Sequence, residues 1–149
     1  MVKKVSSLEK QLGYTFKDKD LLKTALTHKT FAFEAPTPLA YNERLEFLGD
    51  SILNFITAEK LYLTNTYLSE GELTRRRALL VNNNILAEKA KNLDLGSFMR
   101  VGKGEQKQKG YENPSNLANC LEAVFGAIYL DSNLSTTKKI IHNLMFEEN

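Results

Sequence analysis

The sequence has no tryptophan, one cysteine and two histidines among its 149 residues. A single cysteine cannot form a disulfide within the chain, which fits a reducing cytoplasm, and so few thiols and imidazoles argue against a zinc site. Long apolar runs are also missing: the longest uncharged stretch, Ala78 to Ala87, is ten residues, too short to cross a bilayer. No apolar run follows the N-terminal lysines, so no signal peptide is expected.

A strong excess of charge of one sign is likewise absent. Lys and Arg number 20 against 18 Asp and Glu, which leaves a net charge of +2, too small to argue for nucleic-acid binding without local clustering. Hydrophobic residues make up 42% of the chain, and a length near 150 residues suits one globular domain. We therefore expect a single domain over residues 1–149.

The spacing of apolar residues predicts an all-α domain, because helical periodicity recurs and strand-like alternation is never sustained. Ser6 or Ser7 is expected to cap a short helix that Gly13 ends, and Asp18 to start a second. After a predicted loop over 31–39, a long helix is expected over about 40–65. Its apolar face is predicted to contain Leu45, Leu48, Ile52, Phe55, Ile56 and Leu63.

Four more helices are expected in the second half of the chain. Ser69 has capping-box spacing to Glu72 and starts a helix towards Val81. The asparagines at 82–84 break this helix and cap another, which extends to about residue 93. Residues 96–110 are expected to form a loop with a short extended piece. Asn113-Pro114 opens a helix to about residue 130, and a last helix is expected over about 135–146.

Three carboxylates share one face of the long predicted helix. Glu43, Glu46 and Asp50 are spaced i, i+3, i+7, which confines them to about 60° of arc. No Lys or Arg lies three or four residues from any of them, and the aromatic Phe47 lies beside the stripe. A solvated helix face and a divalent-cation site at an interface both fit this pattern.

A second acidic position lies in an apolar helix. Asn119 and Glu122 are spaced i, i+3 within LANCLEAVFGAIYL, where a buried carboxylate is costly unless it is paired or metal-bound. An exposed end of an amphipathic helix is the simpler alternative. Because the available donors are all oxygens, any metal would be Mg²⁺ or Mn²⁺ rather than zinc.

With these motifs in view, the sequence resembles the nuclease domain of the ribonuclease III family. NERLEFLGDSIL (42–53) looks like the family signature. Four further blocks match in order, namely residues 12–30, 69–88, 95–105 and 121–131, and a long signature with ordered blocks is far more specific than one short motif. The resemblance implies a helical nuclease domain that forms a homodimer and cleaves double-stranded RNA with Mg²⁺, leaving 5′-phosphate and 3′-hydroxyl ends. It also implies a cytoplasmic role in RNA processing, ribosomal RNA included.

The resemblance assigns roles to individual residues. Glu46, Asp50, Asn119 and Glu122 match the metal positions, and Asp50 and Glu122 among them match the catalytic ones. Glu43 and Glu70 match acidic residues that line the valley for RNA, and Phe47 matches the aromatic that inserts into the partner subunit. Lys103, Lys107 and Lys109, in a glycine-rich segment, are candidates for contacts with RNA phosphates.

Asn119 departs from the family pattern, which has Asp at that position. An Asn oxygen can still bind Mg²⁺ but carries no charge, so the cluster falls from −4 to −3 and metal affinity and catalysis should both fall. The chain is thus expected to be a nuclease impaired by Asn119. The alternative is a catalytically silent RNA-binding or scaffold dimer of the same fold. Family members of simple architecture also carry a double-stranded-RNA-binding domain, which we do not find within residues 1–149.

Overall fold

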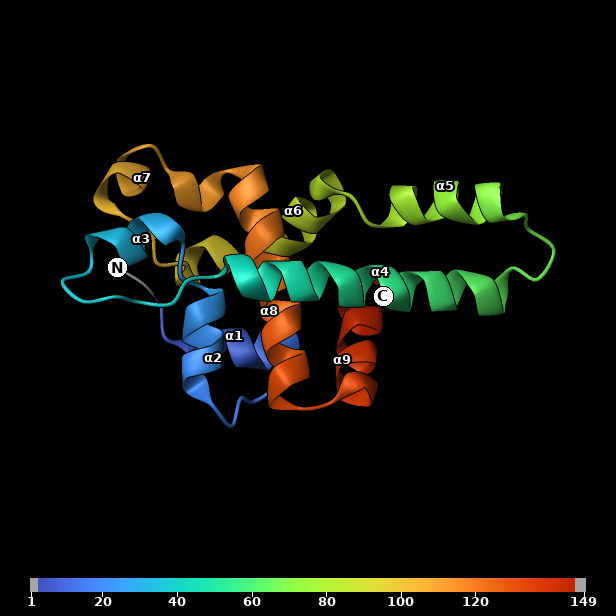
Figure 1. The fold of residues 1–149 in the computed structure, drawn as a ribbon, viewed down its shortest axis with the longest axis horizontal. Helices are drawn as coiled ribbons and strands as arrows, with labels where there is room; N and C mark the ends of the chain where they lie inside the picture. The colour runs from blue at the N-terminus through green and yellow to red at the C-terminus, as the bar shows by residue number, and fades with distance from the viewer. Residues whose placement is uncertain (1–2, 147–149) are drawn as a thin grey trace.

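The computed structural model describes residues 3–146, and within them the fold is helical, as the sequence predicts (Figure 1). The first half contains α1 (Val5–Leu12), α2 (Lys19–Ala25), α3 (Lys29–Glu34) and the long α4 (Glu43–Thr64). The second half contains α5 (Glu70–Leu80), α6 (Asn83–Asn92), α7 (Lys103–Lys107), α8 (Pro114–Asp131) and α9 (Leu134–Ile141). Single turns of other helix types cover Leu95–Phe98, Gly110–Glu112 and His142–Phe146. None of the helices in the described part of the chain is both long and apolar enough to cross a membrane.

Helix α8 is the centre of the core. Figure 1 shows α4 crossing α8 near its middle, and α6 and α2 also pack against α8. Every residue of α8 from Leu117 to Ile128 except Asn119 is buried, which explains why this helix is apolar all round rather than along one stripe. The core is completed by residues such as Leu22, Leu53, Leu86 and Ile141 from the surrounding helices.

Most of the predicted helix starts are confirmed by side-chain caps. The side chains of Asp18, Ser69, Asn82 and Asn113 each accept a hydrogen bond from a backbone N–H in the first turn of the helix that follows. The predicted cap of α1 was wrong. That helix begins at Val5, before Ser6 and Ser7, and its N-cap residue, Lys4, makes no side-chain cap bond.

Two segments predicted as loops are partly helical. Residues 31–34 belong to α3, which the ring nitrogen of His28 caps by accepting from the Thr30 N–H. Residues 103–107 form α7, held because the Glu34 carboxylate accepts from the Lys103 backbone N–H. Both helices are short, so their existence depends on contacts between distant segments rather than on helix propensity.

The second half of α4 extends past the core and carries α5 alongside it (Figure 1). Two residues predicted for the buried face of α4, Phe55 and Leu63, are 53% and 64% exposed. The prediction was wrong at Phe55, because Ile56 and Leu61 further along α4 are buried, so the core reaches past Phe55 and its side chain lies outside the buried stripe. No side chain of α5 is buried.

Candidate metal and RNA site

The crossing of α4 and α8 brings two acidic segments together. At this point two glycines replace side chains: a Cβ at Gly49 would overlap the carbonyl oxygen of Glu122, and a Cβ at Gly126 would overlap the carbonyl oxygen of Leu45. The helix backbones can therefore approach one another closely. Because Asp50 follows Gly49 directly, this packing sets the carboxylates of the two helices side by side.

Glu122 is the most deeply buried carboxylate of the crossing, with 6% of its surface exposed. Its pKa is raised to about 9, chiefly by burial and then by the hydrogen bond to Asp50 and the charges of Asp50 and Glu46. Glu46 is half-buried, and its pKa is raised by burial and then by the charges of Glu43 and Asp50. Both shifts have the same physical cause, since anions have been gathered where water is scarce.

No cation compensates the three carboxylates at the crossing. Within residues 3–146, none of Glu46, Asp50 and Glu122 forms an ion pair with Lys or Arg. Glu43 differs, because Lys29 on α3 lies 3.7 Å from its carboxylate, although both side chains are about half exposed. On α4, Glu43 therefore has a cationic partner, whereas half-buried Glu46 and exposed Asp50 have none.

The donor set at the crossing fits a hard divalent cation. Mg²⁺ binds oxygen ligands, keeps several waters, and is commonly held by one or two protein carboxylates, which Asp50 and Glu122 can supply. In the described residues no three Asp, Glu, His or Cys side chains are already gathered as a metal-binding group. Asp50 and Glu122 thus supply ligand atoms of the kind that Mg²⁺ binds. Glu46 lies close enough for its charge to raise the pKa of Glu122.

Asn119 lies on α8, three residues before Glu122, and its side chain is half-buried. This spacing places the two residues on one face of the helix. The neighbouring Cys120 is fully buried, and its thiol donates to the Ala25 carbonyl oxygen at 3.4 Å. Burial also raises the pKa of that thiol, so Cys120 has a packing role and Asn119 is the polar residue at this edge.

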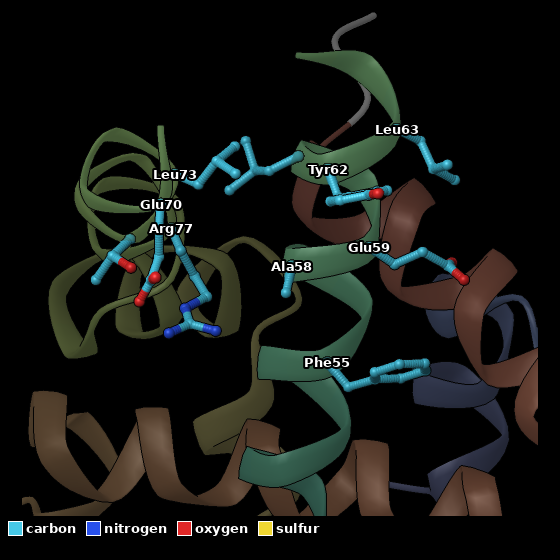
Figure 2. Close-up of a pocket in the computed structure, with 10 residues that line it drawn as sticks. Phe55, Ala58, Glu59, Tyr62, Leu63, Glu70, Leu73 and Arg77 are labelled. Carbon is cyan, nitrogen blue, oxygen red and sulfur yellow. The ribbon is translucent and has the colours of Figure 1, made fainter. Parts of the chain in front are cut away.

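Glu70 does not join the other carboxylates within one copy of the chain. It lies at the start of α5 and lines a cavity between α4 and α5, in which Figure 2 shows it on the same helix face as Arg77. Tyr62 of α4 borders the same cavity, twelve residues beyond Asp50. At a rise of 1.5 Å per residue this is roughly 18 Å along α4.

The three candidate lysines are exposed and lie together at α7. Lys103 and Lys107 are the first and last residues of this helix, and Lys109 follows it in a left-handed backbone conformation with φ 56°. A residue pair spaced i, i+4 shares a helix face. The segment is anchored by Thr30, whose hydroxyl accepts from the Gly102 N–H. The lysines thus extend from an ordered segment rather than the loop predicted for residues 96–110.

Phe47 is 78% exposed on α4, beside an apolar cavity of about 750 Å³. An aromatic side chain this exposed costs free energy in water unless something covers it. The cavity beside it is bordered by Leu21, Ala40, Tyr41, Leu48 and Leu130.

Sequence reasoning missed a second exposed apolar surface, on the second half of α4 and on α5. Phe55, Tyr62, Leu63 and Leu79 are all more than half exposed, and the first three line the cavity of Figure 2 with Leu73. The sequence carried a signal: apolar residues continue at helical spacing to the end of α4. Nothing in that spacing could show which of these residues the neighbouring helices cover.

Comparison with known proteins agrees with this architecture. A model of the Ribonuclease-III-like family matches residues 18–148. Ribonuclease 3 of Buchnera aphidicola subsp. Acyrthosiphon pisum is 50% identical over 134 residues, which is 90% of this chain. Ribonuclease 3 of Pasteurella multocida is 48% identical over 143 residues, or 96% of the chain. The matched regions span only 57% and 61% of those two relatives.

Solved structures extend the likeness to the fold. The nuclease domain of ribonuclease III from Campylobacter jejuni superposes with a TM-score of 0.89 at 40% identity, covering 99% of both chains. Dicer from Pichia stipitis superposes with a TM-score of 0.63 at 29% identity, covering 87% of this chain and 54% of that one. By sequence over most of its length and by fold over nearly all of it, this chain belongs to the ribonuclease-III-like family.

Proposed function

We propose that this domain is a Mg²⁺-dependent endonuclease that cleaves double-stranded RNA and leaves 5′-phosphate and 3′-hydroxyl ends. One observation carries the proposal: buried Glu122 meets Asp50 and Glu46 with no cation to compensate them. A structural carboxylate would be expected to have a cationic partner at such a position. Membership of the ribonuclease-III-like family supports metal binding and catalysis as the role of these carboxylates.

The residues of the site would have different roles in metal binding and catalysis. When bound, Mg²⁺ would polarise the scissile phosphate and lower the pKa of a water molecule, with Mn²⁺ able to replace it. Asp50 and Glu122 would hold the cation as the catalytic pair, and Glu46 and Asn119 would complete the metal-binding set. The neutral amide of Asn119 supplies one charge fewer than Asp would, which impairs the site.

RNA would be bound through its backbone. Lys103, Lys107 and Lys109 are free to contact phosphates because their side chains are exposed on an ordered segment. Such contacts position a duplex without reading its sequence. Glu43 and Glu70 would border the valley in which the duplex lies, and the separation of Glu70 from the other acids means that the valley requires two copies of the chain.

The second copy would dock through Phe47. The exposed ring and the apolar cavity beside it lie on the same part of α4, as a self-complementary two-fold interface requires. A related structure, the nuclease domain of ribonuclease III from Campylobacter jejuni, is described as having a region involved in dimer formation. We propose a cytoplasmic homodimer in which each Phe47 enters the cavity of the partner.

A second candidate function is an RNA-binding or scaffold dimer without catalytic activity. Asn119 favours it, because the charge missing there weakens metal binding. The retention of Glu46, Asp50 and Glu122 favours the enzyme, since a silent domain has no use for uncompensated acids near its core.

A cleavage assay separates the two candidates. End-labelled duplex RNA is incubated with the domain while Mg²⁺ or Mn²⁺ is raised in tenfold steps, and single-stranded RNA of the same sequence is the control. The enzyme should cut only the duplex, and only with metal. Retention of the duplex on the protein without cleavage at any metal concentration would instead support the silent dimer.

A further inference from the structure

A third cavity, of about 530 Å³, lies away from the acidic crossing, between α1, α2 and the segment 98–100. It shares no lining residue with the carboxylate site, the Phe47 cavity or the α4–α5 cavity. Its volume is within the range of small-molecule sites. The residues that matter for its chemistry are Lys4, Val5, Lys23, Leu26, Phe98 and Arg100.

The cavity carries more positive charge than its own acids neutralise. Two of its lysines are already paired, Lys3 with Asp94 at 2.8 Å and Lys19 with the buried Glu9 at 2.7 Å. In residues 3–146, however, Lys4, Lys23 and Arg100 form no ion pair. Three cations thus line one concave surface without an ion pair, although the charge of Asp20 acts on Arg100 from a greater distance.

Arg100 is fixed in place rather than mobile. Its backbone N–H donates to the Leu26 carbonyl at 2.8 Å, and its carbonyl accepts from the His28 N–H at 2.9 Å. Its guanidinium donates to the Thr27 hydroxyl through two nitrogens, at 3.0 and 2.7 Å, and lies 4.9 Å from the centre of the Phe31 ring. A half-buried guanidinium held in this way is preorganised to bind an anion, because little side-chain entropy remains to be lost.

The rest of the lining is apolar. Leu26 and Phe98 line the cavity with only 1% of each residue exposed, and the partly buried Val5 packs against the same core. The methylene stems of lysines extend such surfaces while their ammonium groups stay at the rim. The site therefore combines an apolar floor with a charged rim, which suits an amphipathic anion.

We propose that this cavity binds a small organic diphosphate or triphosphate of mononucleotide size. Three unpaired cations match the charge of about −3 on a diphosphate ester better than the single charge of a carboxylate, and guanidinium groups bind phosphate oxygens in pairs. The non-phosphate part of the ligand would lie on Val5 and Leu26. A duplex RNA backbone fits less well, since it is convex and the unpaired charges converge in a hollow.

Calorimetric titration of the intact domain with ADP, AMP and adenosine tests the proposal. ADP should bind, AMP should bind about tenfold more weakly because charge-assisted contacts are lost, and adenosine should not bind measurably. Lys4→Gln with Lys23→Gln should weaken ADP binding about tenfold or more for the same reason. The matched control is Lys10→Gln with Lys139→Gln, which removes the same charge from exposed positions outside the cavity and should leave binding within about twofold.

Arg100→Lys provides a second variant in which the charge is kept and the paired geometry is lost, with circular dichroism to verify folding. Failure of ADP to bind at millimolar concentration, or equal binding by the lysine variant and the control, would overturn the proposal. So would a short duplex RNA that binds through the same two lysines and is not displaced by ADP, since this would assign the cavity to the RNA backbone.

Discussion

Gly49 of α4 faces the backbone carbonyl of Glu122 on α8 so closely that no side chain fits between the two helices. We predict that Gly49→Ala lowers the free energy of unfolding by about 1–3 kcal/mol, as overpacking in a core does. It should also weaken metal binding, because the helices that carry Asp50 and Glu122 are forced apart. Chemical denaturation measures the first effect.

The control for this change is Gly71→Ala on α5. A Cβ at Gly71 meets nothing within 4 Å, so the substitution should be neutral or stabilise the helix by up to about 1 kcal/mol. Equal destabilisation by both substitutions would mean that the helix crossing is not as tight as described.

Asn119→Asp restores a negative charge at a proposed metal contact without changing side-chain size. It should lower the Mg²⁺ concentration needed for cleavage and raise the rate by up to about 10²-fold, as for groups that tune a metal site. It should also lower metal-free stability, because a further carboxylate adds repulsion. Asn84→Asp adds the same charge on the exposed surface of α6 and should change neither Mg²⁺ dependence nor rate. An unaltered rate and metal dependence in Asn119→Asp would remove Asn119 from the site.

The sequence was sufficient to predict much of this fold, and the reasons are local. Asp18, Ser69 and Asn113 cap helices by bonding to backbone groups two or three residues away, so their effect can be read from spacing alone. The carboxylates of α4 and α8 could also be identified from local sequence, because no Lys or Arg lies one helical turn away from them.

Features that depend on tertiary contacts could not be predicted. The pairing of Lys29 with Glu43, the anchoring of α7 by Glu34 and the exposure of Phe55 all follow from how distant segments meet. Periodicity indicates an apolar face of a helix, but not which residues of that face the neighbouring helices cover.

Phe47→Ala should weaken the proposed homodimer. Loss of an aromatic that fills a pocket in the partner typically costs about 2–4 kcal/mol of binding free energy. Sedimentation or light scattering over a concentration series should show the dissociation constant rising. Leu134→Ala, which truncates an exposed apolar residue on α9, should leave association unchanged. A wild-type domain that is monomeric at tens of micromolar would contradict the interface.

The Tyr14 hydroxyl donates to Asp131 at 2.6 Å and ties the end of α8 to the segment after α1. Burial, followed by this hydrogen bond and the charge of Asp131, raises the pKa of Tyr14 from 10.0 to about 12. Because the pKa of Tyr14 is higher in the folded protein than in the unfolded chain, its interactions stabilise the fold in full below pH 10. This contribution is lost as the pH rises towards 12.

Tyr14→Phe should therefore cost about 1 kcal/mol at neutral pH, and its deficit relative to the wild type should shrink as the pH rises from 10 to 12. Tyr129→Phe is the control. Within residues 3–146, the Asp131 carboxylate accepts hydrogen bonds from the Tyr14 hydroxyl and from the backbone N–H groups of Lys17 and Asp18, and not from the Tyr129 hydroxyl. Thermal unfolding at several pH values measures both variants. A deficit that stays constant across this range would show that Tyr14 ionisation is not linked to unfolding.

The most direct test of the carboxylate site is single-turnover cleavage of a labelled RNA duplex by the wild type, Glu122→Gln and Glu88→Gln, with Mg²⁺ in excess. Glu122→Gln keeps the shape of the buried side chain and replaces a carboxylate that can ionise to bind Mg²⁺ with a neutral amide, while Glu88 is an exposed carboxylate on α6. We expect wild-type cleavage to 5′-phosphate ends, an unchanged rate for Glu88→Gln, and a fall of at least about 10²-fold for Glu122→Gln. Cleavage by Glu122→Gln at the wild-type rate would contradict this expectation.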